Sequence, residues 1–364
     1  MTILADPTAG RRLTAPPVWV IGVDTHTDTH DAVLVDALGA VRAQTRVETT
    51  PAGHARLQAW AQALLPAGQN MFWAVEGSRS HGHGLTRHLQ SAGHRVIEAA
   101  KPVTATRRRG GKSDTIDATH AALTALTADR HAEPRADGTR EALRMLLVTH
   151  RHDTDIRTAT INLFKSLLLG AGELRERLRG LSTARQVRTV LALPDDPAHN
   201  AATDVETRIR AQALRRTATT VRELNKTITT TEKQLRTLVD QYCPGLLDLP
   251  GLGPITAATL LTVWSHHGRV HSEAAFAALG GISPLPASSG RIQRHRLNRG
   301  GDRALNRAMH TIVTTRRRMN HTPTSDYITR RTTEGLTSKE ILRCLKRYTI
   351  RQLYRFLQTN TPTA

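Results

Sequence analysis

The sequence has few cysteines and no long apolar segment. Cys243 and Cys344 are the only cysteines among 364 residues, and they form neither a disulfide framework nor a zinc-ligand spacing. No apolar run approaches the roughly 20 residues that a membrane-spanning helix needs, so no membrane role is expected. Residues 1–17 are too short and too polar for a signal peptide, and we expect them to form a disordered leader. Together these absences predict a cytoplasmic protein.

Acidic residues are also scarce relative to basic ones. The chain has 51 Lys and Arg residues against 31 Asp and Glu, which gives a formal net charge of +20 and a pI of about 11.2. Most of the basic residues are arginines, and they are spread along the whole chain. Because the planar guanidinium group suits phosphate, this composition predicts a nucleic-acid-binding protein. The alternative is a basic surface that is only solvated.

The order of apolar segments and turns predicts an α/β domain in the first third of the chain. Strands are expected at 18–25, 31–36, 41–47, 71–76 and 94–99, and helices near 52–65, 83–92 and 114–128. This order, βββαβαβα, is that of the RNase H-like fold, a mixed sheet with helices on its faces. We therefore expect an RNase H-like domain at 18–130, a helical linker at 131–244 and a mostly α-helical domain at 245–364.

Four carboxylates fall where such a fold would hold a metal. Asp24 and Glu76 end the first and fourth expected strands, and Asp114 and Asp117 share one face of a helix. Carboxylate oxygens are the ligands that Mg²⁺ prefers, and Mn²⁺ is the alternative ion. Two such ions stabilise both the attacking and the leaving oxygen of a phosphodiester displacement. The competing interpretations are helix capping by Asp114 and turn roles for the strand-end acids.

Other polar residues near these acids receive a lesser role. Asp28 and Asp31 are interpreted as surface or turn residues. The histidines that flank Asp24 and Glu76 could ligate a metal or contact phosphate, but they lack a zinc-site spacing and are interpreted as ordinary residues: His26, His30, His81 and His83. A basic stretch runs directly into KSDTIDA and is expected to hold a phosphate backbone, unless it is a solvated run: Arg107, Arg108, Arg109 and Lys112.

A heptad pattern marks the end of the helical linker. Its apolar positions are seven residues apart, and two threonines weaken the intervening positions: Leu214, Val221, Ile228, Leu235 and Tyr242, with Thr217, Leu224, Thr231 and Leu238 between them. The pattern favours an oligomerising coiled coil. The alternative is a helix packed on its own chain.

The segment LPGLGP, followed by ITAATLLTVW, predicts a helix-hairpin-helix. Gly251 and Gly253 would let the backbone approach a phosphate, which N–H groups at the helix start would bind. The alternative is a simple Gly/Pro turn between core helices. Residues 338–358 are expected to form a final helix with a basic outer face.

A serine pair lies in a cationic loop downstream. Ser288 and Ser289 precede a glycine and a series of arginines: Arg291, Arg294, Arg296 and Arg299. A serine hydroxyl can act as a covalent nucleophile where a base or nearby charge activates it and cations stabilise the developing charge. On the residues alone, a flexible Ser-Ser-Gly turn is the simpler interpretation.

Taken together, the motifs resemble the DEDD transposases of the IS-one-ten type of bacterial insertion sequence. IGVDTHTDTHDAVLVD, AVEGSRSHG and KSDTIDA are similar to the family's three acidic segments. LPGLGPITAATLL, FAALGGISPLPASSG and GLTSKEILRCLKRYTIRQLY are similar to its C-terminal transposase domain. The resemblance spans residues 18–128 and 245–357. It departs from the family at NRGGD, 298–302, where a Lys-Gly-Asn stretch is usual.

The resemblance implies a mechanism. A RuvC-like domain would supply Asp24, Glu76, Asp114 and Asp117 as metal-binding acids. Ser289, with Ser288 as the fallback, would attack DNA to form a covalent phosphoserine bond, in a site composed with those acids. A non-coding guide RNA encoded by the element, the bridge RNA, would select donor and target DNA by base pairing. The resemblance also implies a dimer or tetramer, associated with a bacterial nucleoid.

Two other functions remain open at this level. One is a RuvC-like nuclease that cuts DNA or Holliday junctions with water as the nucleophile. The other is a non-enzymatic helix-hairpin-helix scaffold whose carboxylates are structural.

Overall fold

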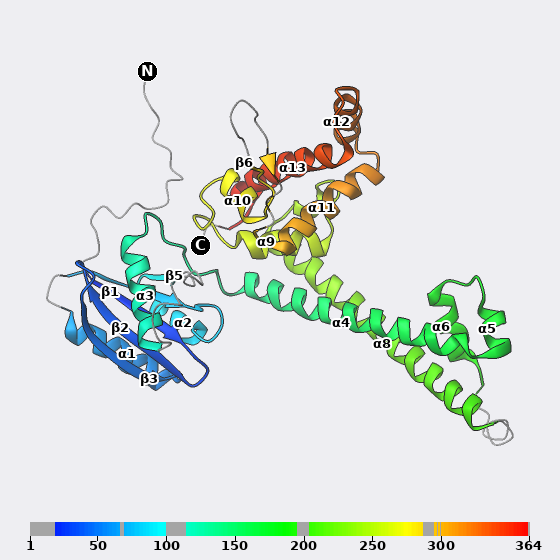
Figure 1. The fold of residues 1–364 in the computed structure, drawn as a ribbon, viewed down its shortest axis with the longest axis horizontal. Coiled ribbons are helices and arrows are strands. Elements are labelled where there is room, and N and C mark those ends of the chain that lie inside the picture. Colours follow the sequence, from blue (N-terminus) through cyan, green and yellow to red (C-terminus); the bar gives the residue numbers. More distant parts are fainter. Residues whose placement is uncertain are drawn as a thin grey trace. The chain divides into compact units, whose positions relative to one another are not determined.

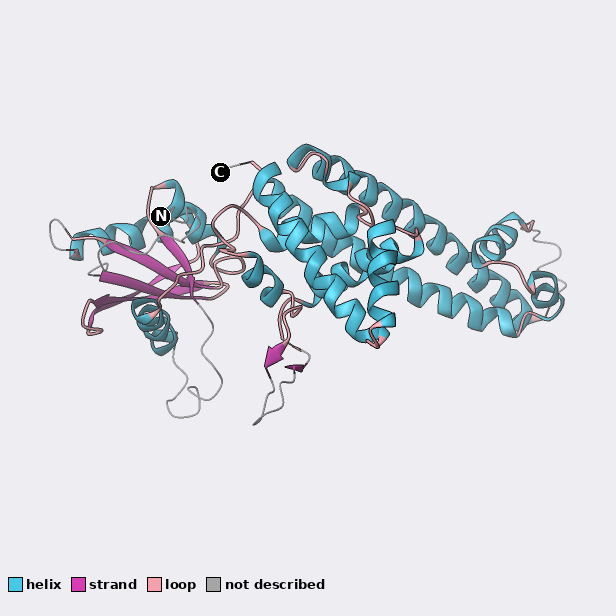
Figure 2. Ribbon diagram, turned by 90° about the horizontal axis from the view of Figure 1, so that it is seen from above, coloured by secondary structure: helices cyan, strands magenta, loops and turns pink. Residues whose placement is uncertain are grey.

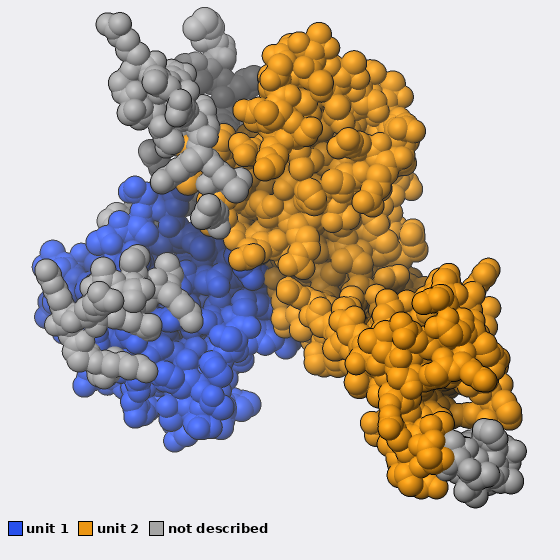
Figure 3. Space-filling model, turned by 45° about the vertical axis from the view of Figure 1, so that its right-hand side comes forward, with its two compact units in different colours: residues 1–136, 266–272 blue, residues 137–265, 273–364 orange. Residues whose placement is uncertain are grey.

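The computed structural model describes residues 19–65, 69–99, 114–194, 204–286, 295–296, 298 and 300–362. These form two compact units, coloured separately in Figure 3. The first consists of residues 1–136 with 266–272, and the second of residues 137–265 with 273–364. The expected disordered leader lies outside the described residues.

The first unit is built on a five-stranded mixed sheet (Figures 1 and 2). Its strands follow the order β3-β2-β1-β4-β5. The pairs β1–β2 and β2–β3 are antiparallel, whereas β1–β4 and β4–β5 are parallel. The bounds are β1 Trp19–Thr25, β2 Thr29–Asp36, β3 Val41–Glu48, β4 Met71–Glu76 and β5 Val96–Ala99. The mixed α/β domain predicted from the sequence is confirmed, although β2 begins two residues earlier than expected.

Helices cover both faces of the sheet, because apolar side chains alternate between the faces along the central strands. On one face Ile21, Val23 and Trp73 pack against α1 (Pro51–Leu64) and α2 (His83–Ser91). On the other face Val20 and Phe72 pack against α3 (Asp114–Thr127). The result is a three-layer arrangement with the sheet in the middle.

The packing of α3 on β1 is unusually close. Gly22 lies in β1, where an added Cβ would fall 2.0 Å from the carbonyl oxygen of Ala118 and 2.7 Å from the backbone nitrogen of Ala122. Ala121 and Ala125 complete the small-residue face that α3 turns toward the sheet. Only glycine on the strand and alanines on the helix permit this approach. Because Gly22 meets Ala118, the first turn of α3 lies at the end of β1 that carries Asp24.

Two long helices form the axis of the second unit. These are α4 (Thr139–Leu169) and α8 (Val205–Tyr242), which run antiparallel, since Arg157 of α4 contacts Asn225 and His150 contacts Glu232. Near Leu168, α5 (Gly172–Leu178) and α6 (Thr183–Ala192) close the hairpin around an apolar cluster.

The heptad of α8 is used, at least in part, within the chain. Leu214, Val221, Ile228 and Leu235 are buried, and the first two pack in the cluster that contains Phe164 of α4. Burial of Thr217 and Thr231 shows that the weakened positions also face inward. The helix therefore packs on its own chain, and the oligomerising coiled coil stays a prediction.

The helix α9 (Pro254–Trp264) packs against α4, α8 and α11 (Arg303–Arg318) in the second unit. Nine of its eleven residues are buried, as expected for a helix that is apolar on all sides. The other elements are η2 Leu246–Asp248, α10 Glu273–Leu279, α12 Thr322–Thr333 and α13 Ser338–Asn360, with the short strands β6 Leu285–Pro286 and β7 His295–Arg296. Among the described residues, no helix is long and apolar enough to cross a lipid bilayer.

Candidate metal centre and nucleic-acid surfaces

The four predicted acids come from three elements of the first unit. Asp24 is the penultimate residue of β1, and Asp114 and Asp117 lie in the first turn of α3. In the parallel β1–β4 pair Val23 aligns with Val75, so that Asp24 and Glu76 occupy the next position on each strand. Asp24 and Glu76 are both buried. Strand register and the Gly22 contact thus direct all four toward the same end of the sheet.

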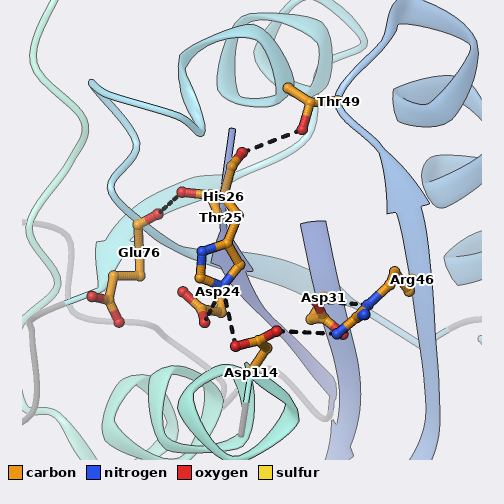
Figure 4. A network of polar contacts seen from close by, with 8 residues as sticks. All are labelled: Asp24, Thr25, His26, Asp31, Arg46, Thr49, Glu76 and Asp114. Carbon is orange, nitrogen blue, oxygen red and sulfur yellow. Dashed lines mark hydrogen bonds and ion pairs between the residues drawn. The ribbon is translucent and has the colours of Figure 1, made fainter. Parts of the chain in front are cut away.

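A histidine links two of these acids (Figure 4). The Nε2 atom of His26 lies 3.1 Å from Oδ2 of Asp24 and 3.3 Å from Oδ1 of Asp114. One ligand atom from each of the three residues can be chosen so that all lie within 4.8 Å of one another. Sequence reasoning gave His26 an ordinary role. Its place two residues after Asp24, in the turn that leaves β1, is the signal that could have identified it.

The pKa of the Asp24 carboxyl is shifted by burial and by the charged groups around it. Burial raises the pKa of its carboxyl above the usual range, and the charges of Asp117 and Asp114 raise it further. His26 opposes this effect and lowers the pKa. Charge interaction with both helix acids shows that Asp117, like Asp114, lies near Asp24. Carboxylate oxygens clustered in this way are hard ligands of the kind that a divalent cation prefers.

Glu76 is held beside β1 through its backbone. The hydroxyl of Thr25 donates a hydrogen bond of 2.8 Å to the carbonyl oxygen of Glu76. Gly77 follows with a φ of +67°, which glycine adopts without strain, and turns the chain away from the strand. This contact ties the ends of β1 and β4 together (Figure 4).

The interpretation of Asp31 as a surface or turn residue is wrong. Asp31 lies within β2 and is buried, with Asp24 opposite it on β1 and Arg46 opposite it on β3. Nε of Arg46 donates to both of its oxygens, at 2.9 and 3.0 Å. Nη2 of Arg46 also donates to Oδ2 of Asp114, at 3.1 Å. Asp28 lies in the exposed turn between β1 and β2, as predicted.

Much of the predicted phosphate-binding and nucleophile set lies outside the described residues. This holds for both serines, for the basic stretch before α3 and for most arginines of the serine loop: Ser288, Ser289, Arg107, Arg108, Arg109, Lys112, Arg291, Arg294 and Arg299. Arg296 lies in β7, which pairs with β6. These residues stay predictions.

The two glycines of the LPGLGP turn have different surroundings. Gly251 has a φ of +82°, and an added Cβ would lie 2.7 Å from the carbonyl oxygen of Ile312 in α11. Gly253 caps α9, its N–H donates to Oγ1 of Thr256, and no atom lies within 4 Å of its virtual Cβ. The buried Arg316 fixes the turn by donating from Nε to the carbonyl oxygen of Pro250 at 2.7 Å. Gly251 is thus needed for packing, whereas Gly253 borders open space.

Sequence reasoning missed a basic groove between α11 and α13. Two cavities of about 550 and 320 Å³ share Asn298, Asn306 and Lys346 in their walls. Burial lowers the pKa of Lys346, whose Nζ lies 3.1 Å from Oδ1 of Asn306, and no ion pair of Lys346 occurs among the described residues. Further cations line the groove: Arg303, Arg307, His310, Arg343, Arg347 and Arg351. Their spacing of three and four residues on each helix is the signal that could have revealed it.

Comparison with known proteins places the chain in a family. A family described as "Transposase", of the DEDD IS110 type, matches residues 21–172, which include Asp24, Glu76, Asp114 and Asp117. The transposase family IS116/IS110/IS902 matches residues 243–329, from the end of α8 into α12. No curated protein matches the chain. The two matches together cover more than half of the sequence, and the chain therefore belongs to the IS110-type DEDD transposases, enzymes that cut and rejoin the DNA of insertion sequences.

Proposed function

We propose that this transposase exchanges DNA strands through a covalent phosphoserine intermediate, with Ser289 as nucleophile and Asp24, Glu76, Asp114 and Asp117 as ligands of Mg²⁺ or Mn²⁺. The observation that carries the proposal is the approach of Asp24 and the helix acids at one end of the sheet. The element order βββαβαβα is also that of RNase H-like nucleases, which keep their acids at such strand ends.

The donor set fits a divalent cation. Asp24 is buried beside two further carboxylates, and burial, together with their charges, raises its pKa. Arg46 contacts Asp114 but is bound mainly to Asp31. A bound divalent cation would stabilise the negative charge that develops on the attacking and leaving oxygens. The chain's own part is to hold the acids rigidly, through β1, β4 and the packing of α3 on Gly22.

The proposed reaction is a transesterification. The serine hydroxyl oxygen forms a bond to the phosphorus of a DNA phosphodiester, while the bond from phosphorus to the leaving sugar oxygen breaks. The hydroxyl proton passes to the solvent or to the leaving oxygen. A second sugar hydroxyl then attacks the phosphoserine and releases the enzyme. Choice of serine over water rests on the family resemblance of FAALGGISPLPASSG.

The basic groove of the second unit supports nucleic-acid binding. Lys346 and the arginines of α11 and α13 offer several cations to a phosphate backbone within a cavity of about 550 Å³ and its neighbour. Gly253 borders open space at the start of α9, where a phosphate could approach the backbone. Guide RNA, implied by the family resemblance, is part of the proposal because it would supply sequence choice through base pairing.

Self-association is part of the same proposal. The helix α4 exposes apolar side chains at near-heptad spacing, and each is at least 39% exposed: Met145, Val148, Ile156 and Leu163. Exposed apolar side chains in a row on one helix are typical of a helix that packs against a partner. A second copy of this chain would cover them.

The test is a search for a protein–DNA adduct. The active protein is incubated with element-end DNA, guide RNA and Mg²⁺, and the products are separated on a denaturing gel. We expect a covalent adduct that Ser289→Ala abolishes and Ser288→Ala retains, and that Asp24→Asn also abolishes. Cleavage without any adduct in either serine variant or the wild type would instead support a RuvC-like nuclease that uses water.

A further inference from the structure

We propose that His26 is an additional metal ligand of this centre and that its imidazole nitrogen favours Mn²⁺ over Mg²⁺. The inference rests on the function proposed above, because it concerns the same carboxylates. It goes beyond that function by adding a nitrogen to a set of oxygen ligands and by predicting which ion binds more tightly.

The backbone of His26 is fixed on both sides. Its N–H donates to the carbonyl oxygen of Thr29 at 3.0 Å, closing the turn between β1 and β2. Its carbonyl oxygen accepts from Oγ1 of Thr49 at 3.3 Å (Figure 4). The imidazole therefore starts from a fixed position at the end of the strand that carries Asp24, as a rigid ligand should.

The ring nitrogen points into the carboxylate cluster. Although 45% of the His26 side chain is exposed, its Nε2 atom is shielded from solvent. That atom lies 3.1 Å from an oxygen of Asp24 and 3.3 Å from an oxygen of Asp114. Among the described residues it has no aligned hydrogen-bond partner. The nitrogen is thus enclosed between two carboxylates, where an ion held by them would also meet its lone pair.

The three side chains are close enough to share one ion. Their ligand atoms lie within 4.8 Å of one another, so that an ion among them needs only small side-chain movements to reach ordinary coordination distances. Arg46, by contrast, binds Asp31 and Asp114 through aligned hydrogen bonds and cannot ligate a metal. Arg46 thus neutralises charge beside the cluster, whereas His26 offers a lone pair to it.

A nitrogen ligand changes the preference of the site. Magnesium strongly prefers oxygen and keeps several of its waters, whereas imidazole suits first-row transition ions better. Asp24 and Asp114 alone would serve either ion. With His26 added, the site gains affinity for Mn²⁺ more than for Mg²⁺.

The experiment uses the full-length protein loaded with Mn²⁺ alone and measures pulsed electron paramagnetic resonance. We expect modulation from a directly bonded ¹⁴N nucleus, and we expect His26→Gln to abolish it. The same substitution at His152, an exposed histidine of α4, is the matched control and should leave the modulation unchanged. Calorimetry should show that His26→Gln weakens Mn²⁺ binding about tenfold or more and Mg²⁺ binding by less than about threefold.

Failure of this inference is distinguishable from failure of the metal centre. One outcome is that Asp24→Asn abolishes Mn²⁺ binding, but the wild type shows no ¹⁴N coupling, or His26→Gln still shows it. That outcome overturns the role of His26 and leaves the carboxylate site intact. Equal losses of Mn²⁺ and Mg²⁺ affinity in His26→Gln would also overturn the predicted preference. Wild-type protein that binds neither ion would overturn both this inference and the metal-dependent function.

Discussion

Asp24 and Asp31 lie directly opposite each other in the antiparallel β1–β2 pair, yet their carboxylates have different partners. Asp31 is bound by Arg46, which faces it on β3. Asp24 faces the helix acids and His26, and burial raises its pKa. Like charges opposite each other on a sheet are unfavourable, and Arg46 offsets this for one of the two acids. Asp24 is thereby left beside Asp114 and Asp117, whose charges add to the effect of burial on its pKa.

The first prediction concerns Arg46. Replacing it with alanine leaves the buried Asp31 carboxylate without its cation, next to Asp24. We expect Arg46→Ala to lower the urea midpoint of unfolding at pH 7, and to lower it less in acid, where protonation of Asp24, whose pKa is raised, relieves its repulsion with Asp31. The double variant Arg46→Ala/Asp31→Asn should recover most of the loss. A midpoint that the double variant does not restore would contradict the charge explanation.

The second prediction concerns Asp24 itself. The pKa of Asp24 is higher in the folded protein than in the unfolded chain, so that folding favours the protonated carboxyl. The contribution of Asp24 to the free energy of unfolding is therefore favourable below the unfolded pKa. It is lost as the pH rises through the folded pKa, because the ionised carboxylate is then buried. Asp24→Asn should therefore raise the melting temperature at pH 7 in EDTA. In the same protein, strand cleavage should fall about a hundredfold or more, because a metal ligand is lost. Asp28→Asn, in the exposed turn, is the matched control and should change neither quantity.

The α/β domain could be predicted because its central strands are continuous apolar runs and its turns are well marked. The placement of Asp24 and Glu76 follows from that prediction, since each lies at the end of a buried strand. The heptad of α8 shows where such reasoning ends. Periodicity defines the buried face of a helix, but it does not say which helix covers that face. Here α4 of the same chain covers part of it.

The partners of the site residues could not be predicted for a related reason. Strand register places Asp31 opposite both Arg46 and Asp24. That register depends on where β2 begins. Beginning β2 at residue 31 placed Asp31 at its edge, whereas the strand begins at Thr29 and buries it. His26 was missed because a histidine in a turn has no distinguishing spacing; only the packing of α3 brings Asp114 to its ring.

The third prediction concerns a buried histidine pair on the sheet's other side. His30 of β2 is fully buried, neither of its ring nitrogens has a hydrogen-bond partner among the described residues, and its ring stacks on His54 of α1 with centroids 5.5 Å apart. Burial, and secondarily the charge of His54, lowers the pKa of His30 from 6.5 to about 4. His30 is therefore neutral in the folded protein at neutral pH.

The sign of the pH effect follows from that shift. Above pH 6.5 neither state of His30 binds a proton, and stability does not depend on it. Between pH 6.5 and about 4 the unfolded chain binds a proton that the folded protein rejects, so that stability falls by at most about 3 kcal/mol. His30→Leu should reduce the pH dependence of the melting temperature across this window, whereas His152→Leu should leave it unchanged. An unchanged slope in His30→Leu would assign the acid sensitivity to other groups.

The last prediction separates the two glycines of the LPGLGP turn. Gly251→Ala would force a side chain onto a backbone with a φ of +82° and within 2.7 Å of the Ile312 carbonyl oxygen. We expect a loss of about 2–4 kcal/mol in the free energy of unfolding, because strain and a backbone clash combine. Gly253→Ala, with a φ of −127° and open space around its Cβ, should change stability by less than about 1 kcal/mol.

Their effects on nucleic-acid binding should be reversed. A methyl group at Gly253 stands where a phosphate would approach the start of α9, so that Gly253→Ala should weaken binding of a DNA duplex about tenfold in fluorescence anisotropy. The correctly folded fraction of Gly251→Ala should bind normally, because its glycine faces α11 and not the open side. If Gly253→Ala binds as tightly as the wild type at several salt concentrations, the turn serves only to join η2 to α9, and the basic groove around Lys346 must carry the contact alone.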